Sequence, residues 1–395
     1  MSETAELTLL ANLGGEEGDR WQQMAGEPSV AAAAALWASL FGATARRDGV
    51  RASPWDEPAF EWLPGHGALA WWGGTRAAAD PALGGHPLHG AEPDRVEAVH
   101  DKAFALRHGS IPLALRDIAQ AFDPDELTPH DQAIHRMREC LDRWPAGLRR
   151  SFCLKPRLGS SGRGRVRGRD GEPDTPSIRG ALDRLARCGG AILEPWLERT
   201  VDLSVAFHVR PSESGPPLEL LGSLTSISRT AGVPLGHRGE IDSRGRIYSG
   251  SRFDDAAREA GSELALAASE AGFCGPCGID GFGFRDLEGS EVLRPAVEFN
   301  ARFTMGLVAL GCLRRARGHL RQELGVEPGM RAGVLLVYET PGQVWGDLGA
   351  DLVLPLAVLP DRAPERGPAL VGTRDPAALD GVIAALRGTG ADPAQ

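Results

Sequence analysis

The chain has 395 residues, of which 42% are hydrophobic and 24% charged, a globular composition that excludes a disordered or collagen-like protein. This length exceeds what one hydrophobic core serves, so we expect two or three subdomains. The net charge of −10 argues against nucleic acid as a partner, because such binding needs a basic surface. No apolar run approaches the roughly 18 residues that span a bilayer, and the first residues lack the order of a signal peptide. We therefore expect a cytoplasmic protein without a membrane partner.

The first 98 residues predict a small α/β domain. An apolar segment at 7–13 predicts a strand, "GGEEG" a turn, and the alanine-rich stretch from Pro28 to Arg47 a helix. Residues 50–95 are rich in Pro, Gly and Trp and predict loops with one strand at "ALAWW". Because "GGEEG" differs from the G-x-G-x-x-G fingerprint of dinucleotide sites, we assign no nucleotide to it.

Beyond residue 98, hydrophobic periodicity predicts a mixture of helices and hairpins. We predict helices at 102–109, 128–144, 177–188, 253–271, 306–323 and 376–387. We predict strands at 151–156, 191–197, 202–209, 218–228, 277–284, 291–302, 332–339 and 351–359. Polar turns join 202–209 to 218–228 and 277–284 to 291–302, so each pair predicts a hairpin, and 229–250 predicts a long loop.

Six cysteines are scattered along the chain, which favours reduced thiols over a disulfide framework. "CGPC" at 274–277 is the one pair with the spacing of a redox or zinc site. Zinc would need a second pair or nearby histidines. Because the pair leads directly into a predicted strand, packing of small residues is the favoured interpretation.

Only two of the 43 basic residues are lysines, Lys102 and Lys155. Lys155 ends an apolar strand and is followed by "PRLGSSGRG", whose backbone N–H groups can converge on an anion. Lysine is a compact cation that suits phosphate oxygens, so the pattern predicts a phosphate-binding flap, with a mobile surface loop as the alternative. The lysine precedes the glycines, so this is not a Walker P-loop. The alternating arginines 163, 165, 167 and 169 can reach phosphates, although a solvated edge is the favoured interpretation.

The hairpin near residue 290 carries the candidate metal ligands. Glu298, Asn300 and Arg302 alternate along one strand and therefore share a face, and pairing with "GID" brings Asp280 to the same surface. Two carboxylates and an amide oxygen are hard ligands of the kind that Mg²⁺ takes beside phosphates. Asp286 is a rival ligand, but it lies in the predicted turn and should be exposed.

A third pattern is "AILEPWLERTVDLSV", an apolar strand that ends at Glu194 and continues through Trp196 and Leu197. Such a hinge can read an adenine edge with its backbone, and Asp202 is placed to accept hydrogen bonds from ribose hydroxyls. A strand that ends in a glutamate is common, so this pattern alone is weak.

The order and spacing of these motifs resemble the ATP-grasp superfamily over roughly residues 100–310, and "VEFNAR" is similar to the Glu-x-Asn-x-Arg strand of its carboxylase and carboxylate–amine ligase members. The resemblance implies an α/β (α+β) protein of the ATP-grasp fold, in which two α+β subdomains clamp ATP. An N-terminal α/β domain precedes these two subdomains in the chain. The resemblance implies an N-terminal domain at 1–98, a small subdomain with the flap at 99–190, a large subdomain with the metal site at 191–325 and a C-terminal extension at 326–395.

By the same resemblance, phosphates would be held by Lys102, Lys155, Ser160, Ser161 and Gly162. Adenine would be bound by Glu194 with the backbone of Trp196 and Leu197, and ribose by Asp202. Two Mg²⁺ ions, with Mn²⁺ as an alternative, would be bound by Asp280, Glu298 and Asn300. Arg302 would stabilise an acyl phosphate.

The implied reaction is that of an ADP-forming ligase, in which ATP activates a small-molecule carboxylate that an amine then captures, an amino acid or a peptide being among the candidates. Arg229, His237 and Arg238 in the predicted loop are candidates for gripping the substrate carboxylate, with an ordered surface loop as the alternative. "FTMG" after "EFNAR" departs from well-known members, so no particular substrate is carried over. A phosphotransferase and a non-catalytic nucleotide-binding protein stay open, as does a homodimer.

Overall fold

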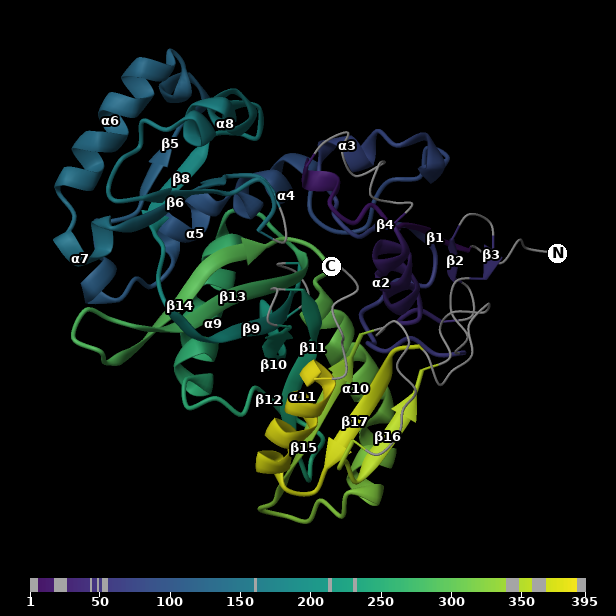
Figure 1. The fold of residues 1–395 in the computed structure, drawn as a ribbon. Helices are drawn as coiled ribbons and strands as arrows, with labels where there is room; N and C mark the ends of the chain where they lie inside the picture. Colours follow the sequence, from purple (N-terminus) through teal and green to yellow (C-terminus); the bar gives the residue numbers. More distant parts are fainter. Residues whose placement is uncertain are drawn as a thin grey trace.

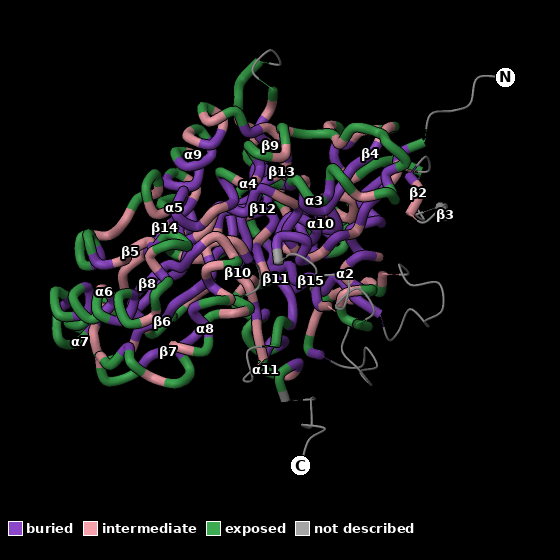
Figure 2. The backbone as a smooth tube through the Cα atoms, turned by 90° about the horizontal axis from the view of Figure 1, so that it is seen from above, coloured by how far each residue is buried: buried purple, intermediate pink, exposed green. Residues whose placement is uncertain are grey.

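The computed structural model describes residues 6–17, 27–42, 45–47, 50–51, 56–159, 162–211, 215–229, 233–338, 348–356 and 367–388. Within these ranges the chain forms three β-sheets with helices packed around them (Figure 1). Buried segments follow the strands through the centre of the molecule, and exposed turns lie at its rim (Figure 2). None of the helices in the described ranges combines the length and apolar composition that crossing a bilayer requires.

The N-terminal unit has a four-stranded sheet in the order β3-β2-β1-β4, with β1 parallel to β2 and β4. Its strands are β1 (Leu7–Leu10), β2 (Ala45–Arg47), β3 (Val50–Arg51) and β4 (Gly67–Ala70). Its helical segments are η1 (Gly15–Glu17), α2 (Pro28–Ala38), α3 (Thr75–Ala78), η2 (Pro81–Leu83) and α4 (Pro93–His100).

The predicted α/β domain is therefore present, but the prediction of one helix from Pro28 to Arg47 is wrong. The helix ends at Ala38, and the buried residues Leu40 and Phe41 turn the chain back into the core. Residues 45 and 46 then pair with β1, so the sheet supplies backbone hydrogen bonds that a longer helix would have made.

An aromatic cluster joins the N-terminal unit to the rest of the molecule. Trp37 in α2 meets Phe41, Trp71 and Phe303 edge-on, with ring centroids 5.4, 5.8 and 5.5 Å away. Phe303 follows the candidate metal hairpin in the sequence, and its backbone N–H donates to the carbonyl of Trp71 at 3.1 Å. The cluster thus fixes the N-terminal unit against the segment that carries Arg302.

The second unit has a small antiparallel sheet in the order β5-β8-β6-β7. Its elements are α5 (Lys102–His108), η3 (Leu113–Leu115), β5 (Gln120–Phe122), η4 (Pro124–Leu127), α6 (His130–Asp142), α7 (Ala146–Arg149), β6 (Ser151–Pro156), β7 (Val166–Arg169), α8 (Pro176–Arg187) and β8 (Ala191–Pro195). Phe152, Leu154 and Leu193 pack into one core with apolar residues of α6 and α8. Since side chains alternate along a strand, Lys155 and Glu194 lie on the opposite face of this sheet.

The third unit has a nine-stranded sheet in the order β14-β13-β9-β10-β11-β15-β17-β16, with β12 beside β11. Its strands are β9 (Arg199–Val209), β10 (Leu218–Ser228), β11 (Pro234–Asp242), β12 (Ile247–Tyr248), β13 (Gly275–Arg285), β14 (Glu291–Asn300), β15 (Arg331–Val337), β16 (Leu352–Pro355) and β17 (Ala369–Thr373). Its helices are α9 (Asp254–Glu270), α10 (Met305–Glu323), η6 (Pro376–Ala378) and α11 (Leu379–Gly388).

Helices cover both faces of this large sheet. Gly261 of α9 approaches Phe207 and Ile279 on one face, whereas Gly306 of α10 approaches Ser204 on the other. Helix α11 packs on the C-terminal strands, and those strands extend the sheet beyond β11 (Figure 1).

Both hairpins predicted from the sequence are confirmed, as antiparallel pairs β9–β10 and β13–β14. The prediction of a long loop at 229–250 is wrong, because this segment contains β11 and β12. Two glycines hide strand β11 from a search for apolar alternation. A side chain at Gly236 would lie 2.1 Å from the carbonyl oxygen of Leu336, so close pairing with β15 requires glycine there. The short strand β17 was not predicted either.

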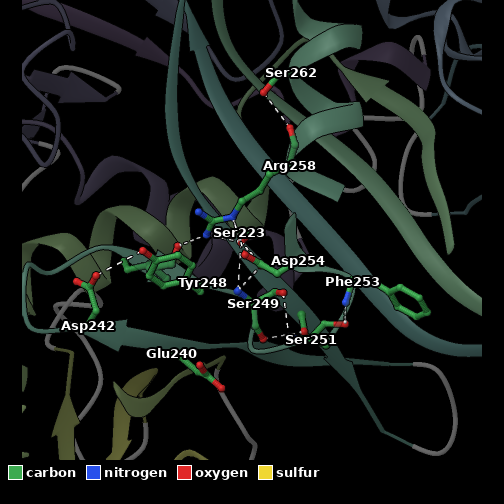
Figure 3. Close-up of polar contacts among 12 residues, drawn as sticks. Ser223, Glu240, Asp242, Tyr248, Ser249, Ser251, Phe253, Asp254, Arg258 and Ser262 are labelled. Carbon is green, nitrogen blue, oxygen red and sulfur yellow. Dashed lines mark hydrogen bonds and ion pairs between the residues drawn. The ribbon is translucent and has the colours of Figure 1, made fainter. Parts of the chain in front are cut away.

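A buried polar network fixes the start of α9 against β10 and β12 (Figure 3). Asp254 accepts hydrogen bonds from the Ser223 hydroxyl at 2.5 Å and from the Ser249 N–H at 2.8 Å. Arg258, one turn further along α9, lies 2.7 Å from Asp254 and donates to Ser223 at 2.7 Å. Since the members satisfy one another, this network is structural and gives no sign of a ligand.

Candidate active site

Lys102 is the first residue of α5, and its neighbours fix it beside the glycine-rich segment. Asp101 caps the helix and also accepts from Arg157 Nε at 3.0 Å. The Lys102 backbone N–H donates to the carbonyl of Arg157 at 3.1 Å, and its ammonium group donates to the carbonyl of Gly159 at 2.7 Å. Burial lowers the pKa of Lys102. The helix start is thereby attached to the chain that leaves β6.

Lys155 lies in a buried ion pair that joins the small and large sheets. Its Nζ is 3.0 Å from Oε1 of Glu194 in β8, and Oε2 of Glu194 is 2.9 Å from Arg294 of β14. Burial acts to raise the pKa of Glu194, but the charges of Lys155 and Arg294 outweigh it and lower this pKa to about 2. Glu194 is therefore ionised at neutral pH and holds Lys155 in place. Sequence reasoning did not find Arg294, because its role comes from a contact between two sheets.

The candidate metal ligands lie together on the β13–β14 hairpin. Asp280 and Glu298 are directly opposite each other in the antiparallel ladder, as their alternation predicted. The Asn300 amide donates to Asp280 Oδ2 at 2.8 Å. Burial raises the pKa of Asp280 to about 6, and the neighbouring charge of Glu298 adds to this effect.

The two lysines and the hairpin meet at Glu298. Its Oε1 lies 3.9 Å from Nζ of Lys102 and 3.9 Å from Nζ of Lys155. Two ammonium groups thus lie beside Glu298, and a second carboxylate, that of Asp280, lies opposite it on the adjacent strand. This is an arrangement in which phosphate oxygens can be held next to a divalent cation.

No group of three or more His, Cys, Asp or Glu side chains in the described ranges is arranged to hold a metal ion. The candidate set consists of two carboxylates and one amide, and its chemistry fits Mg²⁺. The pKa of Asp280 is raised first by burial and then by the charge of Glu298, so ionising this carboxyl is costly in the protein alone. A divalent cation would remove that cost, and hard oxygen ligands suit it.

Comparisons with known proteins identify the fold. No protein-family model and no curated protein matches the sequence. Among solved structures, the biotin carboxylase of Campylobacter jejuni in complex with βγ-ATP covers 94% of this chain and 88% of its own, at 12% identity and a TM-score of 0.51. The biotin carboxylase domain of 2-oxoglutarate carboxylase from Hydrogenobacter thermophilus covers 96% and 88%, at 14% identity and a TM-score of 0.51. The chain has the ATP-grasp fold.

The sequence motifs resemble those of ATP-grasp proteins, and the fold that this resemblance implies is thus confirmed over nearly the whole chain. At these identities the likeness concerns the fold alone. The roles of individual residues in this ATP-grasp chain therefore depend on its own geometry.

The hinge of the ATP-grasp chain follows β8. Trp196 is half-buried, and its ring lies under the guanidinium groups of Arg165 and Arg167, 5.0 and 4.7 Å from the ring centroid. Arg167 of β7 and Arg165, which precedes that strand, thus contact the hinge rather than only lining a solvated edge. Leu197 is also half-buried, and Gly162 has a φ of +66°. Ser160 and Ser161 lie outside the described residues.

Asp202, the candidate ribose ligand, lies on β9 and is half exposed. Its carboxylate accepts from Arg199 at 2.9 Å, and the Arg199 guanidinium also covers the ring of Phe282 at 4.1 Å. Asp286 lies in the turn as predicted, where it accepts hydrogen bonds from backbone N–H groups of that turn.

The three residues proposed to grip a carboxylate do not share a face. His237 on β11 is buried. Its Nδ1 shares a hydrogen bond of 2.5 Å with the Tyr338 hydroxyl, and its Nε2 lies 3.3 Å from the Ser226 hydroxyl. Burial lowers the pKa of His237 to about 4, so it is neutral. Arg238 points the other way and pairs with Asp380 of α11. Arg229 follows β10, and its side chain makes no hydrogen bond or ion pair within the described ranges, so its role stays a prediction.

Two residues that sequence reasoning missed lie beside Arg302. The Nε atom of Arg302 is 3.2 Å from Oε1 of Glu16, which belongs to the "GGEEG" turn to which no ligand was assigned. His100 accepts from the N–H of Ala301 at 3.3 Å, and burial together with the charges of Arg302 and Lys102 lowers its pKa well below the usual value. The one sequence signal for Glu16 was the glycine pair before it.

All six cysteines are free. Cys277 is buried at the sheet, and burial raises its pKa. The interpretation of "CGPC" as a packing feature agrees with this environment.

Proposed function

We propose that the protein is an ATP-dependent, ADP-forming ligase that activates a carboxylate as an acyl phosphate and joins it to an amine. One observation carries the proposal: Glu298 lies 3.9 Å from both Lys102 and Lys155 and directly opposite Asp280. Cations for phosphates and oxygens for a divalent metal thus occur at one place. The two carboxylase structures that share the fold contain βγ-ATP in one case and MgADP, ADP and bicarbonate in the other.

The nucleotide is proposed to lie between the small and large sheets. Its phosphates would be bound by Lys102, Lys155, Ser160, Ser161 and Gly162. Its base and ribose would be bound by Glu194, Trp196, Leu197 and Asp202. The carboxylate of Glu194 also holds Lys155 at 3.0 Å, which adds a positioning role to its proposed contact with adenine.

Asp280, Glu298 and Asn300 are proposed to hold two Mg²⁺ ions, with Mn²⁺ as the alternative. When bound, Mg²⁺ would neutralise phosphate charge. Lys102 and Lys155 would add positive charge beside Glu298, and Arg302 would stabilise the acyl phosphate. Positioning and electrostatics are the main contributions of such a site.

In the proposed reaction, a carboxylate oxygen of the substrate forms a bond to the γ-phosphorus, and the bond between that phosphorus and the β,γ-bridging oxygen breaks, which releases ADP. The amine nitrogen then attacks the acyl carbon, and the carbon–oxygen bond to phosphate breaks. The amine loses its proton to solvent, so the products are an amide, ADP and phosphate. Arg229 stays a proposed contact to the substrate carboxylate.

We also propose a cytoplasmic location, the four-part division at residues 98, 190 and 325, and small-molecule substrates without nucleic acid. The Hydrogenobacter domain is a dimer in its structure, so a homodimer is also proposed here, and light scattering of the purified chain tests it.

Incubation with ATP, Mg²⁺, pools of carboxylates and hydroxylamine tests the reaction class. We expect ADP release that depends on a carboxylate, with formation of the corresponding hydroxamate, because hydroxylamine captures acyl phosphates. A phosphorylated alcohol would instead assign a phosphotransferase. ATP binding without any ADP release, across substrate pools, would overturn the ligase proposal in favour of a non-catalytic nucleotide-binding protein.

A further inference from the structure

The turn after β1 brings Glu16 to the reaction centre, and the sequence of the turn fixes it there. Gly14 has a φ of +88°, which favours glycine. A side chain at Gly15 would lie 2.8 Å from Asn12 Nδ2 and 3.3 Å from the ring of Trp72, so only glycine allows this approach. Asn12 holds the backbone of Trp72 through two hydrogen bonds, of 2.9 and 3.1 Å. The turn is therefore rigidly attached to the end of β4.

The Glu16 side chain is fully buried, with 0% of its surface exposed. Its Oε1 is 3.2 Å from Nε of Arg302, and neither of its oxygens accepts a hydrogen bond from the residues that the structure describes. A buried carboxylate is costly unless it is paired, and Arg302 is its ion-pair partner. In the part of the chain that the structure describes, the buried Glu16 carboxylate thus forms its ion pair with Arg302.

Arg302 also contacts one of the candidate metal ligands, Asn300. One terminal nitrogen donates to Asn300 Oδ1 at 3.2 Å, and the other donates to the carbonyl of Phe303 at 3.0 Å. The Asn300 amide donates to Asp280 at 2.8 Å. A continuous row of contacts therefore runs from Glu16 in the N-terminal unit through Arg302 and Asn300 to Asp280.

We propose that Glu16 is a positioning residue of the reaction centre, which orients the Arg302 guanidinium and, through it, the amide of Asn300. A guanidinium is planar, so fixing its Nε edge fixes the direction of both terminal nitrogens. Arg302 then presents its Asn300-facing nitrogen in one orientation, and this sets which way the amide oxygen points. This inference rests on the proposed function, since Arg302 and Asn300 take their roles from it.

The test compares Glu16→Gln, which keeps the size of the side chain and removes its charge, with Glu6→Gln. Glu6 belongs to the same N-terminal unit and pairs with Arg46 at 3.2 Å on the surface, so it is a matched control. Two properties are measured: the affinity of the protein–ADP complex for Mn²⁺ by electron paramagnetic resonance, and kcat and KM for ATP in the hydroxamate assay. Thermal melts establish that each variant is folded.

For Glu16→Gln we expect Mn²⁺ affinity to fall about 10-fold, as for loss of a partner that orients a metal ligand. We expect kcat to fall about 100-fold while KM for ATP changes less than about twofold, because the misplaced group acts on the reacting phosphoryl and not on nucleotide binding. The double variant Glu16→Gln with Arg302→Met should be no slower than Arg302→Met alone, since Glu16 acts through Arg302.

Wild-type values of Mn²⁺ affinity and kcat in Glu16→Gln would overturn the inference and leave the proposed function standing. Independent, multiplying losses in the double variant would likewise overturn it, because a merely structural role predicts them. A wild-type protein that binds Mn²⁺ and ADP but shows no turnover would overturn the ligase proposal. The Mn²⁺ affinities of wild type and Glu16→Gln would still decide the role of Glu16. A wild-type protein that binds neither would overturn both.

Discussion

The ammonium group of Lys102 lies 3.9 Å from the carboxylate of Glu298, although α5 and β14 belong to different units of the fold. Lys102 is also buried, and burial lowers its pKa. In the described ranges, the Lys102 ammonium donates one hydrogen bond, to the carbonyl of Gly159, so it has further donors to offer. Such donors suit phosphate oxygens at this place.

Replacing Lys102 with methionine should therefore weaken ATP binding about 10- to 100-fold, the range expected for a lost hydrogen bond to a charged group. Isothermal titration with a non-hydrolysable ATP analogue measures this. Arg138→Gln removes a positive charge from the exposed face of helix α6 and is the control. Equal affinities of wild type and Lys102→Met would contradict the assignment of this lysine to the phosphates.

Asp280 should make the metal-free protein less stable as pH rises from about 4 to 6. Its folded pKa is about 6 and lies above the ordinary value of 3.8, so the folded state binds the proton more tightly than the unfolded state. The stabilising effect of that proton is present below pH 3.8 and is lost as pH rises through 6. It amounts to roughly 2–3 kcal/mol at most.

The measurement is the difference in melting temperature between wild type and Asp280→Asn from pH 4 to 7, with EDTA and then with Mg²⁺ and ADP. In EDTA, wild type should lose stability relative to Asp280→Asn as pH rises. Mg²⁺ with ADP should abolish that trend, because the bound cation favours the ionised carboxylate. If the difference in melting temperature between the two proteins does not change with pH in EDTA, burial does not raise the pKa of Asp280.

Glu194→Gln should destabilise the fold by about 3 kcal/mol, because it leaves Lys155 and Arg294 without their buried anion. The pKa of Glu194 is lowered to about 2, so its contribution is complete above pH 4.5 and is lost as pH falls towards 2. Urea unfolding at pH 7 measures the loss. Glu172→Gln, which breaks an exposed pair with Arg138, should have no measurable effect. Similar losses in the two variants would refute the buried pair as a stabilising contact.

Trp196→Ala should expose the flap to trypsin. Arg165 and Arg167 both lie over the Trp196 ring, and loss of the ring frees these two cleavage sites. Limited proteolysis followed by mass spectrometry should show faster cleavage after both arginines, and ATP should slow it in the wild type. Leu197→Ala is the control, since leucine has no aromatic ring on which the arginines could stack. Unchanged cleavage in Trp196→Ala would mean that the stacking does not hold the flap.

Much of the fold follows from local patterns in the sequence. The strand of Lys155 and the helix of Lys102 were predicted within a residue or two, because apolar periodicity and caps are local signals. The pairing of Asp280 with Glu298 followed from alternation within one hairpin. By contrast, strand β11 was missed because Gly236 reflects close contact with β15, which lies nearly 100 residues further along the chain, and Gly239 reflects contact with β10 and β12.

By itself, then, the sequence determined the periodic elements, the rarity of lysine and the hairpin that carries the acidic residues, since each depends on residues that are neighbours in the chain. Only the tertiary structure decided that Glu16 faces Arg302, that Glu194 lies between Lys155 and Arg294, and that His237 and Arg238 point to opposite sides. Those relationships join segments that are far apart in the sequence. They are set by how sheets and helices pack, and no local pattern encodes the partner of a buried charge.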